Sequence, residues 1–307
     1  MLGVTGADGF VGTALSAEAS RRGITVAQIT RRGGKGKRAM GDLAEASFDP
    51  TLFAGVETVI HCAAMVHVMD STGTADAQAF RRINCSGTLA LARAALTAGV
   101  RRFVFISTVK VLGERTTGRP FSHDDPLAPA DAYAASKAEA EVGLRELVLG
   151  STMELVIVRP PLVHGPGAGG NLAMLLRLLR WRIPLPLAAI RNRRAVLGIE
   201  NLVDALLKAS MAPGAAGQVL LLRDEPLLST PEIARALADG AGSRALLWPL
   251  PERWLRGAAR ALGREAYAGR VLDSLEVSLE HTTAMTGWVP RLSARDGLRR
   301  VARDGGE

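Results

Sequence analysis

A tyrosine and a lysine four residues apart, Tyr133 and Lys137, are the pair in this sequence with the clearest chemical use. They lie in an alanine-rich stretch, where a spacing of four places both side chains on one face of a helix. A free phenol has a pKa near ~10, and a nearby ammonium group lowers it by favouring the phenolate. The pair therefore predicts a general acid/base that moves a proton on and off an alcohol oxygen. A chance pair on a solvated helix face is a poor alternative, because the chain has only two tyrosines and five lysines.

Two hydroxyl residues, Ser107 and Thr108, follow a run of apolar residues that predicts a buried strand. A hydroxyl at the carboxyl end of a central strand is well placed to bind the reacting oxygen. The alternative, a hydroxyl that bonds to its own backbone, is common for a strand end taken alone. It is weakened here because the Tyr133/Lys137 helix is the next predicted element.

A glycine-rich turn follows the first apolar run and precedes a helical pattern, with glycines at Gly6, Gly9 and Gly12. Because glycine has no side chain, such a turn lets the backbone approach a pyrophosphate that binds at the helix N-terminus. Gly12 would also let the helix pack closely on the sheet. The spacing is GxxGxxG and not GxGxxG, and an ordinary strand-to-helix turn is the alternative. The position directly after the first strand favours dinucleotide binding.

The residues after the second predicted strand bear on the type of dinucleotide. A cofactor without a 2′-phosphate is usually met there by a carboxylate, whereas this chain has Arg31 and Arg32. Arginine suits a phosphate dianion, so the sequence favours NADP(H) over NAD. We expect Asp42 and Leu43 to meet the adenine ring, although Asp42 could equally be a surface turn residue.

Composition excludes several classes of protein. The chain has 307 residues, of which 48% are hydrophobic and 22% charged, so it is not a disordered chain. Its formal charge of +8 comes mostly from arginine, and no aromatic residues interleave with the basic clusters. We therefore expect no nucleic-acid partner and assign most of this charge to the surface.

Two cysteines, Cys62 and Cys85, are too few for a disulfide framework, and the histidines lack metal-ligand spacing, so we expect no metal. No window reaches ~18 uninterrupted apolar residues, which argues against a membrane span. The first residues do not resemble a signal peptide. These features together predict a cytoplasmic protein.

Alternating apolar runs and helical patterns predict an α/β fold built on a parallel sheet with right-handed crossovers. Predicted strands cover residues 2–5, 25–30, 58–62, 103–107, 155–159 and 218–222. Predicted helices cover residues 11–22, 75–98, 132–149, 201–211 and 230–238. The site should lie at the carboxyl ends of the strands. Prolines become frequent after Pro160, and we place a boundary near residue 165, with a second domain packed against the first.

Taken in order, these motifs resemble the extended short-chain dehydrogenase/reductases, also called the NAD-dependent epimerase/dehydratase family. The matching segments are Thr5-Gly6-x-x-Gly9-x-x-Gly12, His61-Cys62-Ala63-Ala64, Asn84-x-x-Gly87-Thr88, Ser107-Thr108, Tyr133-x-x-x-Lys137, Arg159-Pro160-Pro161, Gly165-Pro166 and Gly287-Trp288. The resemblance covers nearly the whole chain. It implies a Rossmann-type doubly wound sheet in residues 1–165 and a smaller C-terminal domain in residues 166–307 that binds a nucleotide-sugar. Residues 195–222 are expected to return to the Rossmann sheet.

The resemblance also implies roles for particular residues. Thr108, Tyr133 and Lys137 take the catalytic places, and Lys137 also holds the nicotinamide ribose. Asn171 and Arg194 take the places of diphosphate-binding residues, and a guanidinium suits bidentate phosphate contact. The residues in cofactor-binding places, beyond Arg31, Arg32, Asp42 and Leu43, are Gly6, Gly9, Phe10, Val11, Gly12, Ala63, Ala64, Tyr133, Lys137 and Pro160. The family further implies a homodimer through the helices predicted over residues 75–98 and 132–149.

Departures from the family pattern narrow the reaction. The family's 4,6-dehydratases carry an Asp-Glu pair after the catalytic threonine, where this chain has Val109 and Lys110, so dehydration is disfavoured. Reduction of a 4-keto sugar and 4-epimerisation remain. The segments 63–69, 184–187 and 192–194 resemble a bacterial subgroup that includes reductases making UDP-N-acetylquinovosamine from a UDP-4-keto-6-deoxy sugar.

We therefore expect a UDP-sugar substrate and favour the reductase, because the absent strand-two carboxylate suits an enzyme that exchanges NADP(H). A UDP-sugar 4-epimerase with tightly bound NAD is the alternative within the family. A dinucleotide-sensing protein without chemistry is the alternative outside it, and the intact Tyr-Lys pair argues against that. The exact sugar and the stereochemistry at C4 stay open.

Overall fold

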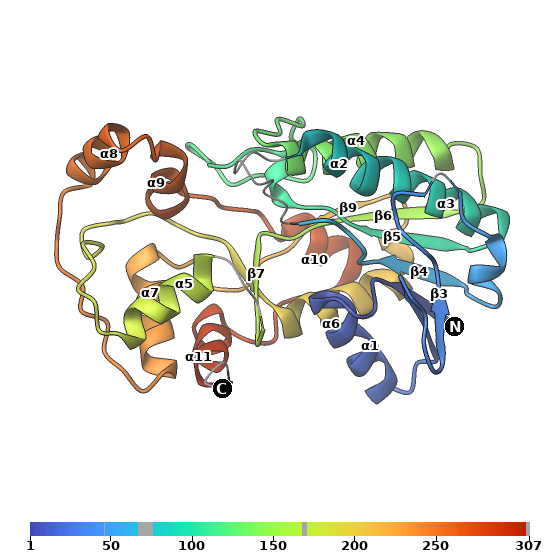
Figure 1. Cartoon of the computed structure of the whole chain (residues 1–307), viewed down its shortest axis with the longest axis horizontal. Coiled ribbons are helices and arrows are strands. Elements are labelled where there is room, and N and C mark those ends of the chain that lie inside the picture. Colours follow the sequence, from blue (N-terminus) through green and yellow to red (C-terminus); the bar gives the residue numbers. More distant parts are fainter. Residues whose placement is uncertain (46, 67–75, 168–170, 305–307) are drawn as a thin grey trace.

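The computed structural model describes residues 1–45, 47–66, 76–167 and 171–304. Its centre is a seven-stranded parallel sheet in the order β3-β2-β1-β4-β5-β6-β9 (Figure 1). The strands are β1 (Leu2–Thr5), β2 (Val26–Thr30), β3 (Lys37–Ala39), β4 (Thr58–His61), β5 (Arg102–Ile106), β6 (Glu154–Arg159) and β9 (Val219–Leu221). The strand order reverses between β1 and β4, which makes this point the switch point at which ligands bind in such sheets. The predicted doubly wound α/β fold is confirmed.

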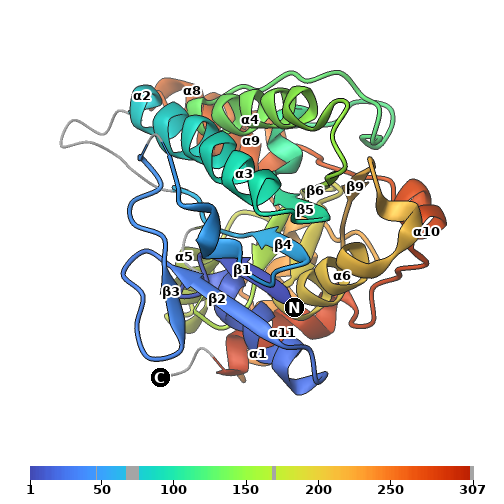
Figure 2. The ribbon, with the colours of Figure 1, turned by 90° about the vertical axis from the view of Figure 1, so that its right-hand side faces the viewer.

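Helices cover both faces of this sheet, as Figure 2 shows. On one face α1 (Phe10–Arg21) packs beside α6 (Ile199–Met211), and on the other α3 (Thr88–Thr97) packs beside α4 (Ala132–Val148). The central strands are mostly apolar and are buried along nearly their whole length, because both of their faces are covered. Two separate apolar cores result, one on each face of the sheet.

The helix predicted over residues 75–98 differs in detail from the observed segment. The chain runs without a break through α2 (Ala77–Phe80), a π-helical stretch η2 (Arg81–Gly87) and α3. Two tertiary contacts fall in the π-helical stretch: Asn84 bonds to both backbone groups of Met65, and Gly87 lies directly against the carbonyl oxygen of Leu43. Such wide turns often occur beside functional sites, and this one faces the loop after β4.

The second half of the chain forms a smaller lobe with its own apolar core (Figure 1). Its helices are α5 (Asn171–Arg180), α7 (Thr230–Gly240), α8 (Glu252–Ala261), α9 (Glu265–Leu272) and α11 (Ala294–Asp304). Helix α10 (Glu280–Thr286) instead packs against β9 and η4 (Pro213–Ala215) at the edge of the large sheet. A two-stranded parallel sheet, β7 (Leu162–His164) with β8 (Val196–Gly198), lies where the chain passes between the lobes. After β8 the chain returns to the large sheet as α6 and the edge strand β9, before it enters α7.

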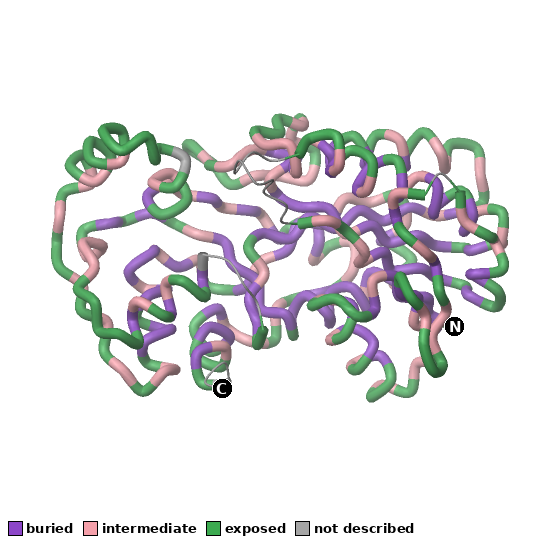
Figure 3. Tube along the Cα trace, viewed as in Figure 1, coloured by how far each residue is buried: buried purple, intermediate pink, exposed green. Residues whose placement is uncertain are grey.

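Burial follows this division into two lobes. Buried residues concentrate in the large sheet and in the helices against it, whereas α8 at the far end of the small lobe has no buried residue (Figure 3). Within the described part of the chain, no helix is long and apolar enough to cross a membrane.

Candidate active site

The glycine-rich turn after β1 leaves no space for side chains. Gly6 has a φ of +64°, and its carbonyl oxygen accepts a hydrogen bond of 2.9 Å from the Gly9 amide. A Cβ atom on Gly12 would lie 2.1 Å from that same carbonyl oxygen, so only glycine permits α1 to start this close to β1. Helix α1 then begins with neither a side-chain cap nor an acidic residue in its first turn. Its free backbone N–H groups and its dipole favour an anion.

This turn fits the pyrophosphate of a dinucleotide, because it combines a cradle that a Cβ would fill with an uncapped helix N-terminus. Phe10 and Val11 begin the helix beside it and are partly accessible. Ala63, which follows β4, closes the other side, since a Cβ on Gly6 would lie 2.7 Å from the Ala63 backbone nitrogen. Ala64 is exposed at the same loop.

The end of β2 presents basic side chains to solvent. Arg31 and Arg32 are exposed. The Thr30 hydroxyl fixes the turn that contains them by accepting a hydrogen bond of 3.0 Å from the Gly33 amide. Lys37, on the edge strand β3 that the sequence did not predict, forms an ion pair with Asp8 of the glycine-rich turn. The Asp8 carboxylate therefore has a cationic partner already.

The two residues predicted to meet the adenine ring lie in different surroundings. Asp42 is exposed, and its carboxylate accepts a hydrogen bond of 2.9 Å from the Ala44 amide, which is typical of a turn. Leu43 is buried at 5% exposure, with its carbonyl oxygen against Gly87 of the π-helical stretch.

Helix α4 carries the side chain of Lys137 into the interior, where it packs against the central strand β5. The side chain is 2% exposed, and its Nζ atom lies 4.0 Å from the centroid of the Phe105 ring on β5. Burial lowers the pKa of this ammonium group to about 7, and the carboxylate of Glu141 one turn further along α4 opposes that fall. Lys137 therefore sits at the carboxyl end of β5 with a proton that it can lose near neutral pH.

Tyr133 lies one turn before Lys137 and is partly accessible, with its ring edge-on to Phe80 at a centroid distance of 6.0 Å. The sequence predicts that the ammonium of Lys137 lowers the pKa of this phenol. The structure differs: burial, with the negative charge of Asp131, raises the pKa of Tyr133 to about 12. The Lys137 ammonium does not contribute to this change in the pKa of Tyr133, and its Nζ atom lies over the Phe105 ring.

The two hydroxyl residues after β5 have separate partners. Thr108 is 8% exposed, and its Oγ1 accepts a hydrogen bond of 3.3 Å from the Lys110 amide, which leaves its own proton free to donate. Ser107 points to the interior and donates a hydrogen bond of 2.6 Å to Glu141. Of the two, Thr108 is thus the one with a proton for another acceptor.

A buried ion pair that the sequence did not predict supports this arrangement. Glu141 is fully buried and accepts hydrogen bonds from Nε and Nη2 of Arg159 at 3.0 and 2.6 Å, besides the bond from Ser107. It thereby connects α4 to the ends of β5 and β6. The signal for it was its position four residues after Lys137, on the same helix face.

Replacing Glu141 by glutamine should lower the free energy of unfolding by about 3–5 kcal/mol, because the Arg159 guanidinium would stay buried without a counter-charge. Urea unfolding measures this, and the matched control is Glu146→Gln, the same change at an exposed position of α4. Equal stability of the two variants would contradict the prediction.

His61 at the end of β4 is another polar group with a defined place. Its ring nitrogens bond to the hydroxyls of Thr5 and Thr88 at 2.7 and 3.0 Å. Burial, with the nearby Lys137 charge, lowers the pKa of His61 to about 3, so the ring is neutral. This neutral imidazole joins β1, β4 and α3 below the glycine-rich turn and holds their relative positions.

The remaining predicted residues are placed as follows. Pro160 follows β6, and its carbonyl oxygen accepts a hydrogen bond of 2.9 Å from the Val109 amide. Arg194 precedes β8; its Nη1 donates to the Asp273 carbonyl oxygen at 3.0 Å, and burial lowers its pKa. Asn171 is the first residue of α5, and its side chain lies outside the described part of the structure, as do residues 67–69 of the subgroup segment.

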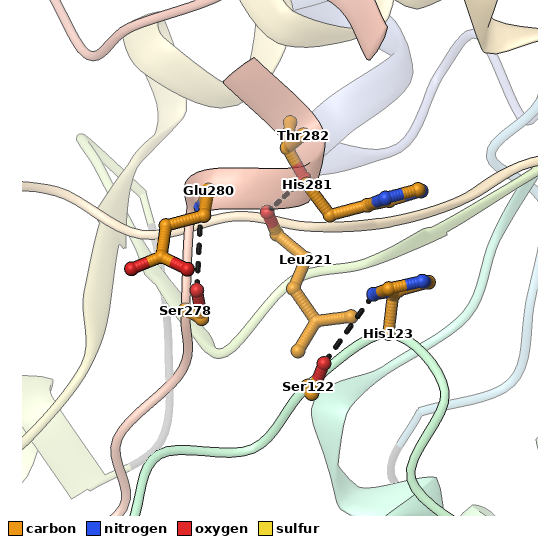
Figure 4. Close-up of a pocket in the computed structure, with 7 residues that line it drawn as sticks. All are labelled: Ser122, His123, Leu221, Ser278, Glu280, His281 and Thr282. Atoms are coloured by element: carbon orange, nitrogen blue, oxygen red, sulfur yellow. Dashed lines mark hydrogen bonds between the residues drawn. The ribbon is translucent and has the colours of Figure 1, made fainter. Parts of the chain in front are cut away.

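A polar pocket of about 100 Å³ lies between the loop after η3 (Val109–Val111) and the start of α10 (Figure 4). Its walls include the stacked rings of His123 and His281, whose centroids are 3.5 Å apart. The carbonyl oxygen of His123 accepts a hydrogen bond of 3.3 Å from Arg159, which connects this pocket to the buried ion pair. Burial and the neighbouring ring of His123 lower the pKa of His281.

Both cysteines are free thiols, and burial raises the pKa of Cys62 to about 12. Among the described residues, no group of three or more His, Cys, Asp or Glu side chains could hold a metal ion.

Comparisons with known proteins agree with this geometry. The model of the NAD dependent epimerase/dehydratase family matches residues 2–220. A UDP-glucose 4-epimerase of Vibrio cholerae is 36% identical over 308 aligned residues, covering 98% of this chain and 94% of that protein.

Solved structures have the same fold. A UDP-glucose 4-epimerase from Thermotoga maritima, with UDP-glucose, superposes with a TM-score of 0.78 at 18% identity, over 99% of this chain and 97% of the other. RMD from Pseudomonas aeruginosa, complexed with NADPH, superposes with a TM-score of 0.76 at 22% identity, over 100% and 99% of the two chains. The chain belongs to the NAD dependent epimerase/dehydratase family and is an NAD(P)-binding enzyme of the extended short-chain dehydrogenase/reductase type.

Proposed function

We propose that this enzyme transfers a hydride at C4 of a UDP-linked sugar and that its net reaction is reduction of a UDP-4-keto-6-deoxy-hexosamine. The observation that carries the proposal is the placement of Lys137, Tyr133 and Thr108 around the carboxyl end of β5, one strand from the switch point. In this proposal residues 1–165 bind the dinucleotide and residues 166–307 bind the nucleotide-sugar, with Asn171 and Arg194 at its diphosphate.

The chain's own groups suit the direction of reduction. NAD(P), when bound, supplies the hydride chemistry at its nicotinamide ring. The pKa of Tyr133, about 12, keeps its phenol protonated at neutral pH, so that it holds a proton for a developing alkoxide. Thr108 has a hydroxyl proton free to orient that oxygen. Lys137 would hold the nicotinamide ribose and, in its charged form, add positive charge to the site as the alkoxide forms.

A second candidate is 4-epimerisation of a UDP-sugar, favoured by the Vibrio cholerae relative described as UDP-glucose 4-epimerase. In that reaction the sugar is first oxidised and then reduced on its other face, so the cofactor is not consumed. The exposed arginines after β2 favour the reductase, because an enzyme that exchanges its cofactor can draw on NADPH.

One assay distinguishes the two candidates. UDP-glucose, UDP-N-acetylglucosamine and a UDP-4-keto-6-deoxy-hexosamine are each incubated with the enzyme and with NADH or NADPH. We expect consumption of reduced cofactor with the keto sugar and a product with a new C4 hydroxyl by NMR. Interconversion of C4 epimers without net consumption of cofactor would instead establish the epimerase, and no reaction with any of the sugars would contradict both.

The cofactor preference is tested separately. We propose that NADP(H) is preferred and that the double variant Arg31→Ala/Arg32→Ala raises the Kd for NADPH by at least about 10- to 100-fold, the loss expected for one charged hydrogen bond of about 1.5–3 kcal/mol. The Kd for NADH should hardly change. Fluorescence titration measures both, with Arg101→Ala at the opposite end of the sheet as the control. An equal loss for both cofactors would contradict a role in recognising the 2′-phosphate.

We also propose a homodimer through α3 and α4. Its support is that Val142 and Leu149, along and just beyond the outer side of α4, are 44% and 85% exposed.

A further inference from the structure

One ion pair joins the two segments that carry Thr108 and Tyr133. Lys110 lies two residues after Thr108 in η3, and its Nζ atom pairs with the carboxylate of Asp131. Asp131 is the N-cap of α4, two residues before Tyr133, and its other carboxylate oxygen accepts a hydrogen bond of 2.7 Å from the Ala134 amide. The same carboxylate therefore caps the helix that carries Tyr133 and binds the loop that carries Thr108.

The ion pair lies in partly shielded surroundings. The side chains of Lys110 and Asp131 are 29% and 32% exposed, and Lys110 also reaches Glu114 at 3.3 Å. Solvent therefore screens this ion pair less than a fully exposed one, and its loss would change the electrostatic potential at nearby groups.

The charge of Asp131 acts directly on Tyr133. This carboxylate raises the pKa of the phenol, and Lys110 is the cation in contact with it. Removing Lys110 would leave the carboxylate without that contact. Its negative charge would then act on the phenol with less compensation.

Other charged groups face this region from the elements packed around it. They are Glu114 from the loop after η3, Arg270 from α9, Arg81 paired with Glu139 between η2 and α4, and Lys137 with Glu141 on the inner face of α4. Arg270 acts on Asp131 through its charge but shares no hydrogen bond with it. Among these described groups, Lys110 alone contacts the Asp131 carboxylate through an ion pair.

We propose that Lys110 is a positioning residue for the proposed reaction: through Asp131 it fixes the first turn of α4 against the loop after β5 and offsets the negative charge nearest to Tyr133. This inference rests on the proposed function of Tyr133 as the proton donor. It assigns a role to a lysine that stands where the family's 4,6-dehydratases carry an acidic residue.

The first test is turnover with saturating substrate at neutral pH. In Lys110→Gln, kcat should fall by about 3- to 10-fold, the size expected for one partly screened charge, while the KM for the sugar changes little, because the phenol donates its proton less readily once the Asp131 carboxylate has lost its cationic partner. Lys110→Arg should restore the wild-type kcat, because it keeps the charge and can reach the same carboxylate. Lys208→Gln on α6 removes the same charge elsewhere and should leave kcat unchanged.

A second variant keeps the proposal testable if Lys110→Gln does not fold. Asp131→Asn retains an oxygen that can accept from the Ala134 amide but removes the charge, so the pKa of the Tyr133 phenol should fall. This shift can be read without any substrate, because the chain has only two tyrosines. In a Tyr267→Phe background the phenolate absorbance reports Tyr133 alone, and Asp131→Asn should lower the pH at which it rises.

The outcomes separate this inference from the proposed function. A kcat of Lys110→Gln equal to that of the wild type, in an enzyme that turns over a UDP-sugar, would overturn the role of Lys110 and leave the function intact. A phenolate titration that does not move in Asp131→Asn would overturn it too. If the wild-type enzyme acts on none of the UDP-sugars, the proposed function fails, whereas the titration still tests the electrostatic link.

Discussion

Tyr133→Phe is expected to lower turnover by about 10²–10⁴, the usual contribution of a general acid, while the KM for the sugar changes little. The ring would keep its edge-on contact with Phe80, so the fold and the cofactor affinity should be preserved. Only the proton that we assign to the developing alkoxide is removed. Steady-state kinetics with the UDP-sugar identified by the product assay measures the effect.

The matched control is Tyr267→Phe, which removes the other phenol of the chain from an exposed position on α9. It should turn over at the wild-type rate. Normal turnover in Tyr133→Phe would show that the proton comes from elsewhere and would contradict the proposed mechanism.

Gly12→Ala should weaken cofactor binding by about two orders of magnitude and lower the free energy of unfolding by about 1–3 kcal/mol, the cost of an extra methyl group in a packed site. The new Cβ would lie 2.1 Å from the Gly6 carbonyl oxygen and 2.8 Å from the Ala7 Cα, both backbone atoms. Helix α1 must therefore move away from the turn, and its free N–H groups move with it. Fluorescence titration with NADPH and urea unfolding measure the two effects.

Gly257→Ala is the matched control for Gly12→Ala, because Gly257 also lies within a helix. It lies in α8, with nothing within 4 Å of the added Cβ, so it should keep cofactor affinity and gain up to about 1 kcal/mol of stability from better helix propensity. Wild-type NADPH affinity in Gly12→Ala would contradict the assignment of this turn as the pyrophosphate site.

The sequence predicted those parts of the fold and site that depend on local patterns. The apolar runs of the central strands, the spacing of Gly6, Gly9 and Gly12 and the four-residue spacing of Tyr133 and Lys137 can each be read within a dozen residues. The strands could be predicted because both faces of a parallel sheet are buried, which makes each strand an apolar run. The family could be predicted from the glycine spacing and the Tyr-Lys pair.

The parts that were not predicted depend on residues far apart in the chain. The ion pair of Glu141 with Arg159 joins α4 to β6, and His61 bonds to hydroxyls 56 and 27 residues away. Strand β3 is short and half-exposed, so it lacks the apolar run that marks a strand. The rise in the pKa of Tyr133 could not be read from spacing either, because it comes from burial in the folded protein.

The return of the chain to the large sheet has a consequence for how the protein can be divided. Strand β9 and helix α6 come after the first segments of the small lobe, yet β9 pairs with β6 and α6 covers one face of the sheet. A polypeptide that ends at residue 165 would expose that apolar face and leave β6 as an open edge, which invites aggregation. The boundary between the lobes is therefore not a place to cut the gene. The first 165 residues can acquire their native structure only with a segment that the ribosome makes later.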